Sequence, residues 1–75
     1  MAATVTAQDR LVLAWLKRAS VHAWLLANPN ATMPQIKRAF HGMKPEGVRA
    51  TVAALLRYGD VVEIRGARTV RYRAA

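Results

Sequence analysis

The fold is decided by residues 28–59, which read NPNATMPQIKRAFHGMKPEGVRATVAALLRYG. Thr32 and Gln35 stand three residues apart, which is the spacing of a capping box at a helix N-terminus. We therefore predict a helix over residues 32–40, and we expect it to end at Gly42, because glycine commonly follows the last turn of a helix.

A second helix is predicted over residues 44–58. Pro45 fits its first helical position, where the missing N–H costs little. Its apolar residues recur at i, i+4, i+7 and i+8 and so share one face, and they are Val48, Val52, Leu55 and Leu56. The quoted segment thus predicts two short helices separated by a glycine-containing turn.

Upstream, apolar residues at helical spacing predict helix from Ala7 to about Ala27, preceded by a loose end, Met1–Val5. Thr6 and Asp9 resemble a capping box at its start. Ser20 is able to cap a separate second helix, so the pattern allows either one bent helix or two.

Downstream, Val61–Arg65 and Thr69–Arg73 alternate like strands, with a tight turn at Gly66-Ala67. We expect one basic hairpin with its apolar residues on one face, namely Val62, Ile64, Val70 and Tyr72. The predicted fold class is small α+β and mostly helical. It consists of an N-terminal helical extension over residues 1–20 and a domain over residues 21–75 with a helix-turn-helix and a two-stranded hairpin.

The composition is strongly basic. Twelve Lys and Arg stand against four Asp and Glu, for a formal charge of +8, and nine of the twelve are Arg. Such a charge attracts DNA, RNA, anionic membrane surfaces or acidic proteins alike.

The chain has no cysteine, which excludes thiolate zinc sites and suits the reducing cytoplasm, where we expect the protein to reside. We expect no membrane span, because Lys17 and Arg18 interrupt the longest apolar stretch.

Catalytic chemistry is not indicated. His22 and His41 are far apart in the sequence, and no Ser/His/Asp grouping stands out. Two isolated histidines supply too few ligands for a metal site. We therefore expect no enzyme activity, no metal and no cofactor.

Residues 21–73 resemble the winged helix-turn-helix domain of bacterial repressors of the arsenic-responsive and multiple-antibiotic-resistance type. The matching parts come in the family's order. They are a helix (21–27), Asn28-Pro29-Asn30, a Thr-capped helix (32–40), a glycine turn (His41-Gly42-Met43), a recognition helix (44–58), Gly59-Asp60-Val61-Val62 and a basic wing (66–73).

The resemblance implies a small transcriptional regulator that binds double-stranded DNA. The helix over 44–58 would read the major groove, and the Arg-rich wing over 63–73 would contact the backbone or the minor groove. The candidate DNA-binding residues are Gln35, Lys37, Arg38, Lys44, Glu46, Arg49, Thr51, Arg65, Arg68 and Arg71.

The candidate DNA-binding residues have different expected roles, namely base contact, backbone contact or a purely structural role. Arg49 is the best candidate for bidentate bonding to guanine, and Arg68 flanks the hairpin turn and suits a backbone or minor-groove contact. Glu46 either accepts from cytosine or stabilises the helix start. Thr51 either touches a phosphate or a thymine methyl or is simply a surface residue.

Two further interpretations stay open for the function. A helix that carries Ala50, Ala53 and Ala54 also suits close contact with a protein, and a basic domain also suits RNA, for which Tyr58 is the one candidate stacking aromatic outside the expected core.

Two tryptophans bear on packing and assembly. We expect Trp24 in the core. Trp15 either packs back on the domain or helps to form a dimer, and we expect a homodimer through the N-terminal segment that also contains Leu11, Val12 and Leu16.

Overall fold

The computed structural model describes the backbone of residues 7–75 and the side chains of residues 13–75. The expected loose end Met1–Val5 and the side chains of the expected Thr6–Asp9 capping box lie outside that part, as do the side chains of Leu11 and Val12. The elements, in chain order, are α1 (Ala7–Ala27), β1 (Ala31–Thr32), α2 (Met33–Ala39), α3 (Pro45–Tyr58), β2 (Val61–Arg65) and β3 (Val70–Ala74). The fold class is small α+β, as predicted.

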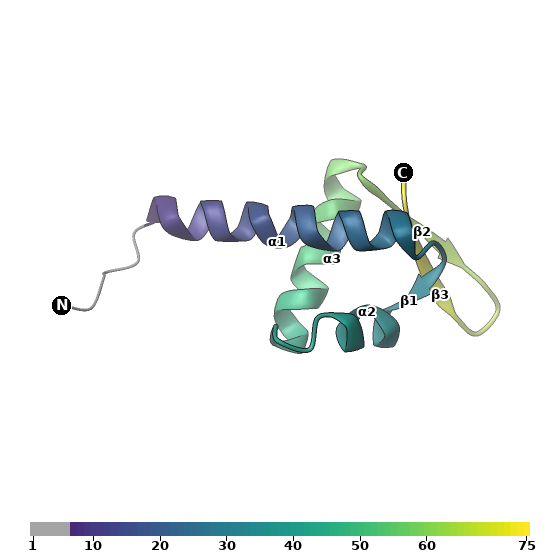
Figure 1. Cartoon of the computed structure of the whole chain (residues 1–75). Helices are drawn as coiled ribbons and strands as arrows, with labels where there is room; N and C mark the ends of the chain where they lie inside the picture. The colour runs from purple at the N-terminus through teal and green to yellow at the C-terminus, as the bar shows by residue number, and fades with distance from the viewer. Residues whose placement is uncertain (1–6) are drawn as a thin grey trace.

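The long helix α1 is a single 21-residue helix that continues through Ser20. It lies across α3, and its N-terminal half projects beyond the rest of the domain (Figure 1). The choice between one helix and two is thereby settled in favour of one. The boundary drawn at residue 20 falls within a continuous helix.

The short helix α2 begins as its sequence predicts. The Thr32 hydroxyl accepts a hydrogen bond from the Gln35 backbone N–H (3.4 Å), and the Gln35 side-chain oxygen accepts from the Thr32 N–H (2.9 Å). Its end differs from the prediction. The helix stops at Ala39 with Phe40 as C-cap, and Gly42 does not adopt a positive φ, so Gly42 is not a capping glycine.

The recognition-helix candidate α3 begins one residue later than predicted and ends where predicted. Lys44 is its N-cap and Pro45 stands in its first turn. Gly59 ends it in the left-handed conformation, with φ of 79°, and its N–H and that of Asp60 bond back to carbonyls of the last turn. This αL ending satisfies carbonyl groups that the helix itself leaves without a partner.

The sheet has one more strand than the sequence predicted. Its order is β1-β3-β2, and all pairs are antiparallel. The two residues of β1, Ala31 and Thr32, pair with Tyr72 and Arg71 of β3. A two-residue strand carries no detectable alternation, so no local pattern indicated it.

The register of the hairpin corrects one prediction. Glu63 pairs with Tyr72 and Ile64 pairs with Arg71, and cross-strand partners share a face of the sheet. Val62 and Ile64 therefore lie on the face opposite Tyr72 and are about one-third exposed (38% and 37%). The expectation that all four apolar residues share one face is wrong, since a shift of one residue exchanges the two faces of a strand.

The core draws at least one residue from every element. Its nine buried members are Val21, Leu25, Ala31, Ile36, Val48, Val52, Leu55, Val61 and Tyr72. Trp24 packs against this cluster, as predicted, and meets Phe40 edge-to-face with the ring centroids 6.1 Å apart. The core thus fixes α1, α3 and the sheet relative to one another.

Candidate functional site

The helix α3 has one buried face and one exposed face. Val48, Val52 and Leu55 point into the core, so the opposite side of the helix faces solvent. The exposed residues of α3 include Glu46, Arg49, Ala50, Ala53 and Arg57. Two of the candidates, Glu46 and Arg49, are therefore accessible to a partner.

The start of α3 combines a positive helix end with basic side chains. Lys44, the N-cap, makes no side-chain capping bond, and its side chain is exposed. Glu46 lies in the first turn, where a carboxylate interacts favourably with the helix dipole. A shallow hollow of about 350 Å³ beside this turn is lined by Pro45, Glu46, Arg49, Ala50 and Ala53.

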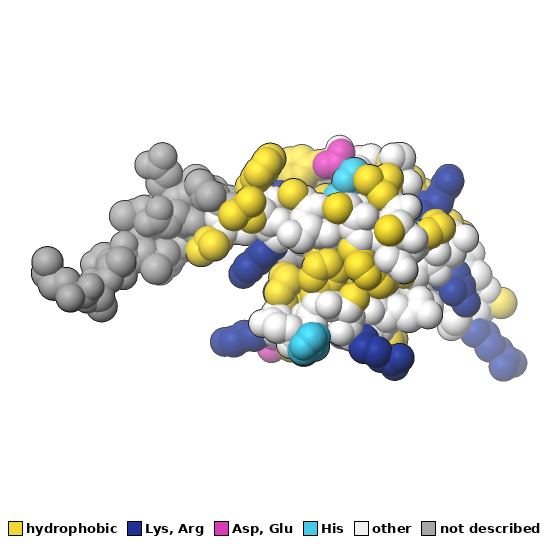
Figure 2. Space-filling view, viewed as in Figure 1, with side chains coloured by type: hydrophobic (Ala, Val, Ile, Leu, Met, Phe, Trp, Pro, Cys, Tyr) yellow, Lys and Arg dark blue, Asp and Glu magenta, His cyan; other side chains and the backbone are white. Residues whose placement is uncertain are grey.

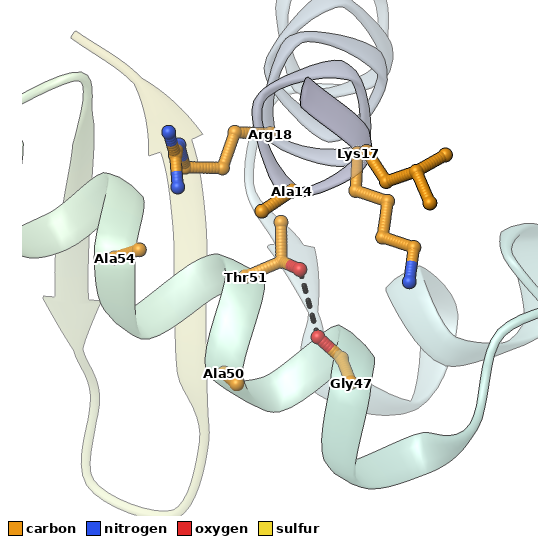
Figure 3. A pocket seen from close by; sticks show the side chains of 8 residues that line it. Ala14, Lys17, Arg18, Gly47, Ala50, Thr51 and Ala54 are labelled. Carbon is orange, nitrogen blue, oxygen red and sulfur yellow. Dashed lines mark hydrogen bonds between the residues drawn. The ribbon is translucent and has the colours of Figure 1, made fainter. Parts of the chain in front are cut away.

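Thr51 does not belong to this exposed face. Its side chain is 8% exposed, and its hydroxyl donates a hydrogen bond of 2.7 Å to the Gly47 carbonyl (Figure 3). It lies where α3 faces Ala14 and Arg18 of α1. The expectation of a DNA contact from Thr51 is corrected on this ground, because the side chain is directed toward α1.

The α2 helix presents a basic surface next to α3. Lys37 is half-buried and Arg38 is exposed, and both stand in the last turn. Cations at this end are favoured by the helix dipole. Gln35 is exposed, but its side-chain oxygen is used in the capping box, so only its amide nitrogen is left to donate to a further partner.

The three candidate arginines of the hairpin differ in whether they form hydrogen bonds or ion pairs with other residues of the chain. The Arg65 Nε atom lies 3.3 Å from a carboxylate oxygen of Glu63. Arg68 lies in the exposed loop between β2 and β3, and the hydrogen bonds found among the described residues do not include its side chain. Arg71 donates a hydrogen bond of 3.0 Å to the Asn30 carbonyl. All three side chains are exposed, and Arg68 is the one of the three for which no hydrogen bond within the described part of the chain is found.

Basic side chains from these elements gather along one edge of the molecule. In Figure 2 dark blue side chains lie over α2, at the N-terminal end of α3 and at the tip of the hairpin, along the lower edge of the view. Figure 1 shows that these three segments lie along the same edge. The fold thus brings cations from sequence-distant segments onto a common surface.

Lys17 is not among the candidate DNA-binding residues that the sequence suggested, yet it lies near the start of α3. It projects from α1 toward the α2–α3 turn and lines a shallow hollow with Met43, Lys44 and Gly47 (Figure 3). No local pattern could have indicated this position, because it results from the way α1 crosses α3.

The exposed aromatic side chains occupy other parts of the surface. Trp15 of α1 is 61% exposed and lines a small hollow with His22 and Leu55. Tyr58 is 64% exposed, and the Arg18 guanidinium lies over its ring at 5.5 Å from the centroid. One face of the candidate stacking aromatic is thus already occupied by a cation from α1.

Within the described residues, no group of three or more His, Cys, Asp or Glu side chains is placed to hold a metal ion. None of the helices in that part has the length and apolar character needed to cross a bilayer. Comparisons with protein-family models, with curated proteins and with solved structures gave no match to this chain.

Proposed function

We propose that this protein binds duplex DNA and acts as a small transcriptional regulator with a winged helix-turn-helix layout. The element order α1-β1-α2-α3-β2-β3 and the sheet order β1-β3-β2 are compatible with that layout. In it, α3 is the recognition helix and the β2–β3 hairpin is the wing.

The observation that carries the proposal is the shared basic edge formed by α2, the start of α3 and the hairpin tip (Figure 2). A duplex presents one phosphate charge per ~1.7 Å of helix axis, so a line of cations from several elements matches it. The net charge of +8 supplies the long-range attraction.

The proposed contacts follow from exposure. The N-terminal half of α3 enters the major groove, where Arg49 binds guanine O6 and N7 and the methyl groups of Ala50 and Ala53 lie against thymine methyl groups. Lys37 and Arg38 of α2 contact phosphates beside the groove. Arg68 at the wing tip reaches the adjacent backbone or minor groove.

The test is titration of a labelled duplex at several salt concentrations, with single-stranded DNA and RNA of the same length alongside. We expect duplex binding with a slope of about −0.9 in log K against log salt for each phosphate contact. A matched pair of variants is Arg68→Ala at the wing and Arg18→Ala, which removes the same charge where it stacks on Tyr58. Only the first should lower duplex affinity markedly.

Two other outcomes of the titration would favour protein binding or RNA binding instead of duplex DNA binding. The hollow beside Ala50 and Ala53 is also a surface on which a protein segment could pack closely. Undetectable duplex binding at low salt would reject the DNA proposal in favour of protein contact. A preference for RNA over duplex DNA would reject it in favour of an RNA-associated role.

A further inference from the structure

The outward side of α1 is largely apolar over residues 13–27, the part of the helix whose side chains the structure describes. Trp15, Leu16 and Leu26 are exposed to 61%, 48% and 62%. The exposed residues between and after them are small, apart from Lys17, and they are Ala19, Ser20, Ala23 and Ala27. Hydrophobic side chains are visible along this helix in Figure 2. We call the surface formed by Leu16, Ala19, Ala23 and Leu26 the α1 seam.

The seam carries no charge, although the chain has a net charge of +8. The two cations in the described part of α1, Lys17 and Arg18, line hollows shared with α3 (Figure 3). Arg18 also lines a hollow with Ala19 and Asp60, so a cation and a carboxylate border one edge of the seam but neither is a member of it. This separation matters because two copies of so basic a chain repel each other wherever their charged faces meet. At the four seam positions, two copies can approach each other without bringing like charges together.

The spacing of the seam residues suits a helix–helix contact. Leu16, Ala19, Ala23 and Leu26 are separated by three, four and three residues, the alternation typical of helices that pack side by side along their length. Along the seam a large side chain is followed by two small ones and then by another large one. This pattern reads the same in both directions along the sequence, about a midpoint at position 21.

We propose that α1 is a dimerisation helix that packs antiparallel against α1 of a second copy. In this arrangement Leu16 meets the partner's Leu26 and Ala19 meets the partner's Ala23, so large residues close the ends and alanines allow close approach in the middle. A two-fold axis through the seam makes the same surface serve both copies, as an isologous interface requires. The antiparallel helix dipoles also oppose each other favourably.

The size of the seam predicts a weak dimer. From Trp15 to Leu26 the helix runs about 17 Å, at 1.5 Å per residue. Two such stretches with the flanking Trp15 side chains bury about 1,000 Å² in total, near the lower limit for a specific interface. We therefore expect dissociation in the micromolar range. None of the candidate DNA-binding residues lies in the seam, so dimerisation and duplex binding can be tested separately.

The first experiment is sedimentation of the full chain between about 1 and 200 µM, a range chosen to bracket a weak interface. The wild type should pass from monomer to dimer. Ala23→Arg places a charge in the middle of the seam and should raise the dissociation constant by at least about tenfold, because a buried unpaired charge is costly. Ala39→Arg makes the same change at an exposed position of α2 and should leave the dissociation constant of the dimer unaltered. Circular dichroism establishes that both variants are folded.

The second experiment uses the absence of native cysteine. An equimolar mixture of Ala19→Cys and Ala23→Cys chains should form a mixed disulfide under mild oxidation faster than either variant joins to itself, because only opposed positions come within disulfide reach. A wild type that stays monomeric overturns the proposal. So does a dimer that survives Ala23→Arg unchanged. Faster self-linking of Ala19→Cys overturns the antiparallel arrangement, since it indicates parallel helices.

Discussion

Arg71 on β3 donates a hydrogen bond of 3.0 Å to the backbone carbonyl of Asn30, 41 residues earlier in the chain. Asn30 is the one described non-glycine residue with a positive φ, 63°, and it stands directly before β1. The bond therefore holds the turn after α1 against the sheet at the point where β1 pairs with β3. It also engages a guanidinium that the sequence alone suggested was directed at DNA.

Replacing Arg71 with alanine should lower the free energy of unfolding by about 0.5–1.5 kcal/mol, the usual net contribution of a hydrogen bond. Arg73→Ala is the matched control, because it removes the same charge from the same exposed face of β3. Chemical denaturation of both variants measures the difference. Equal losses would show that the bond to Asn30 contributes nothing beyond charge.

Arg49→Ala should weaken binding to a selected duplex by roughly 1–3 kcal/mol and weaken binding to random duplex much less, if Arg49 reads a base. Arg68→Ala should instead weaken both duplexes similarly and reduce the salt slope by about 1, as expected for a phosphate contact. Anisotropy titrations with both duplexes measure these effects. An equal loss on both duplexes for Arg49→Ala would assign that residue to the backbone.

Thr51→Ala should lower stability by about 1 kcal/mol while leaving duplex affinity unchanged. The reason is that the Thr51 side chain is buried toward α1 and its hydroxyl bonds to Gly47 within α3. Thermal unfolding and a titration below the melting temperature separate the two quantities. A loss of affinity in the fully folded variant would contradict the position that the structure gives to this residue.

The two turn glycines should respond differently to alanine. Gly59→Ala should destabilise by about 1–2 kcal/mol, because a Cβ is disfavoured at its left-handed φ of 79°. Gly42→Ala should be neutral or stabilise by up to about 1 kcal/mol, since its φ is not positive and a Cβ there would meet nothing within 4 Å. Thermal melts of the pair measure this. Similar destabilisation by both substitutions would contradict the assignment of Gly59 as the sole capping glycine of the two.

Local chemistry predicted much of the secondary structure. The capping box of Thr32 and Gln35 is present and Pro45 stands in the first turn of α3. Strand β2 has the predicted bounds, whereas β3 begins and ends one residue later than alternation placed it. Each of these features depends on residues within a few positions of one another, so the sequence contains the whole of the signal. The buried face of α3 followed from helical periodicity in the same way.

The candidate site was only partly predictable. Exposure of Glu46, Arg49 and Arg68 agrees with the periodicity of α3 and with the position of a hairpin loop. Thr51 was misjudged, although it stands three residues after Val48 and four before Leu55, a spacing that places it beside the buried stripe of α3. Its polar hydroxyl suggested a surface position, but the hydroxyl bonds to the Gly47 carbonyl and the side chain faces α1. Lys17 was missed because it reaches the start of α3 only through the crossing of the two helices.

The sequence by itself determined where the helices, turns and hairpin lie, because caps, prolines, glycines and apolar periodicity act over a few residues. Tertiary structure alone decided the register of β2 on β3, the pairing of the two-residue β1 and the side of α1 that remains exposed. In the observed arrangement Val61 and Tyr72 are buried in the core with residues of α1 and α3, and such burial depends on residues far apart in the chain. The shared basic edge and the uncharged α1 seam are both consequences of that packing.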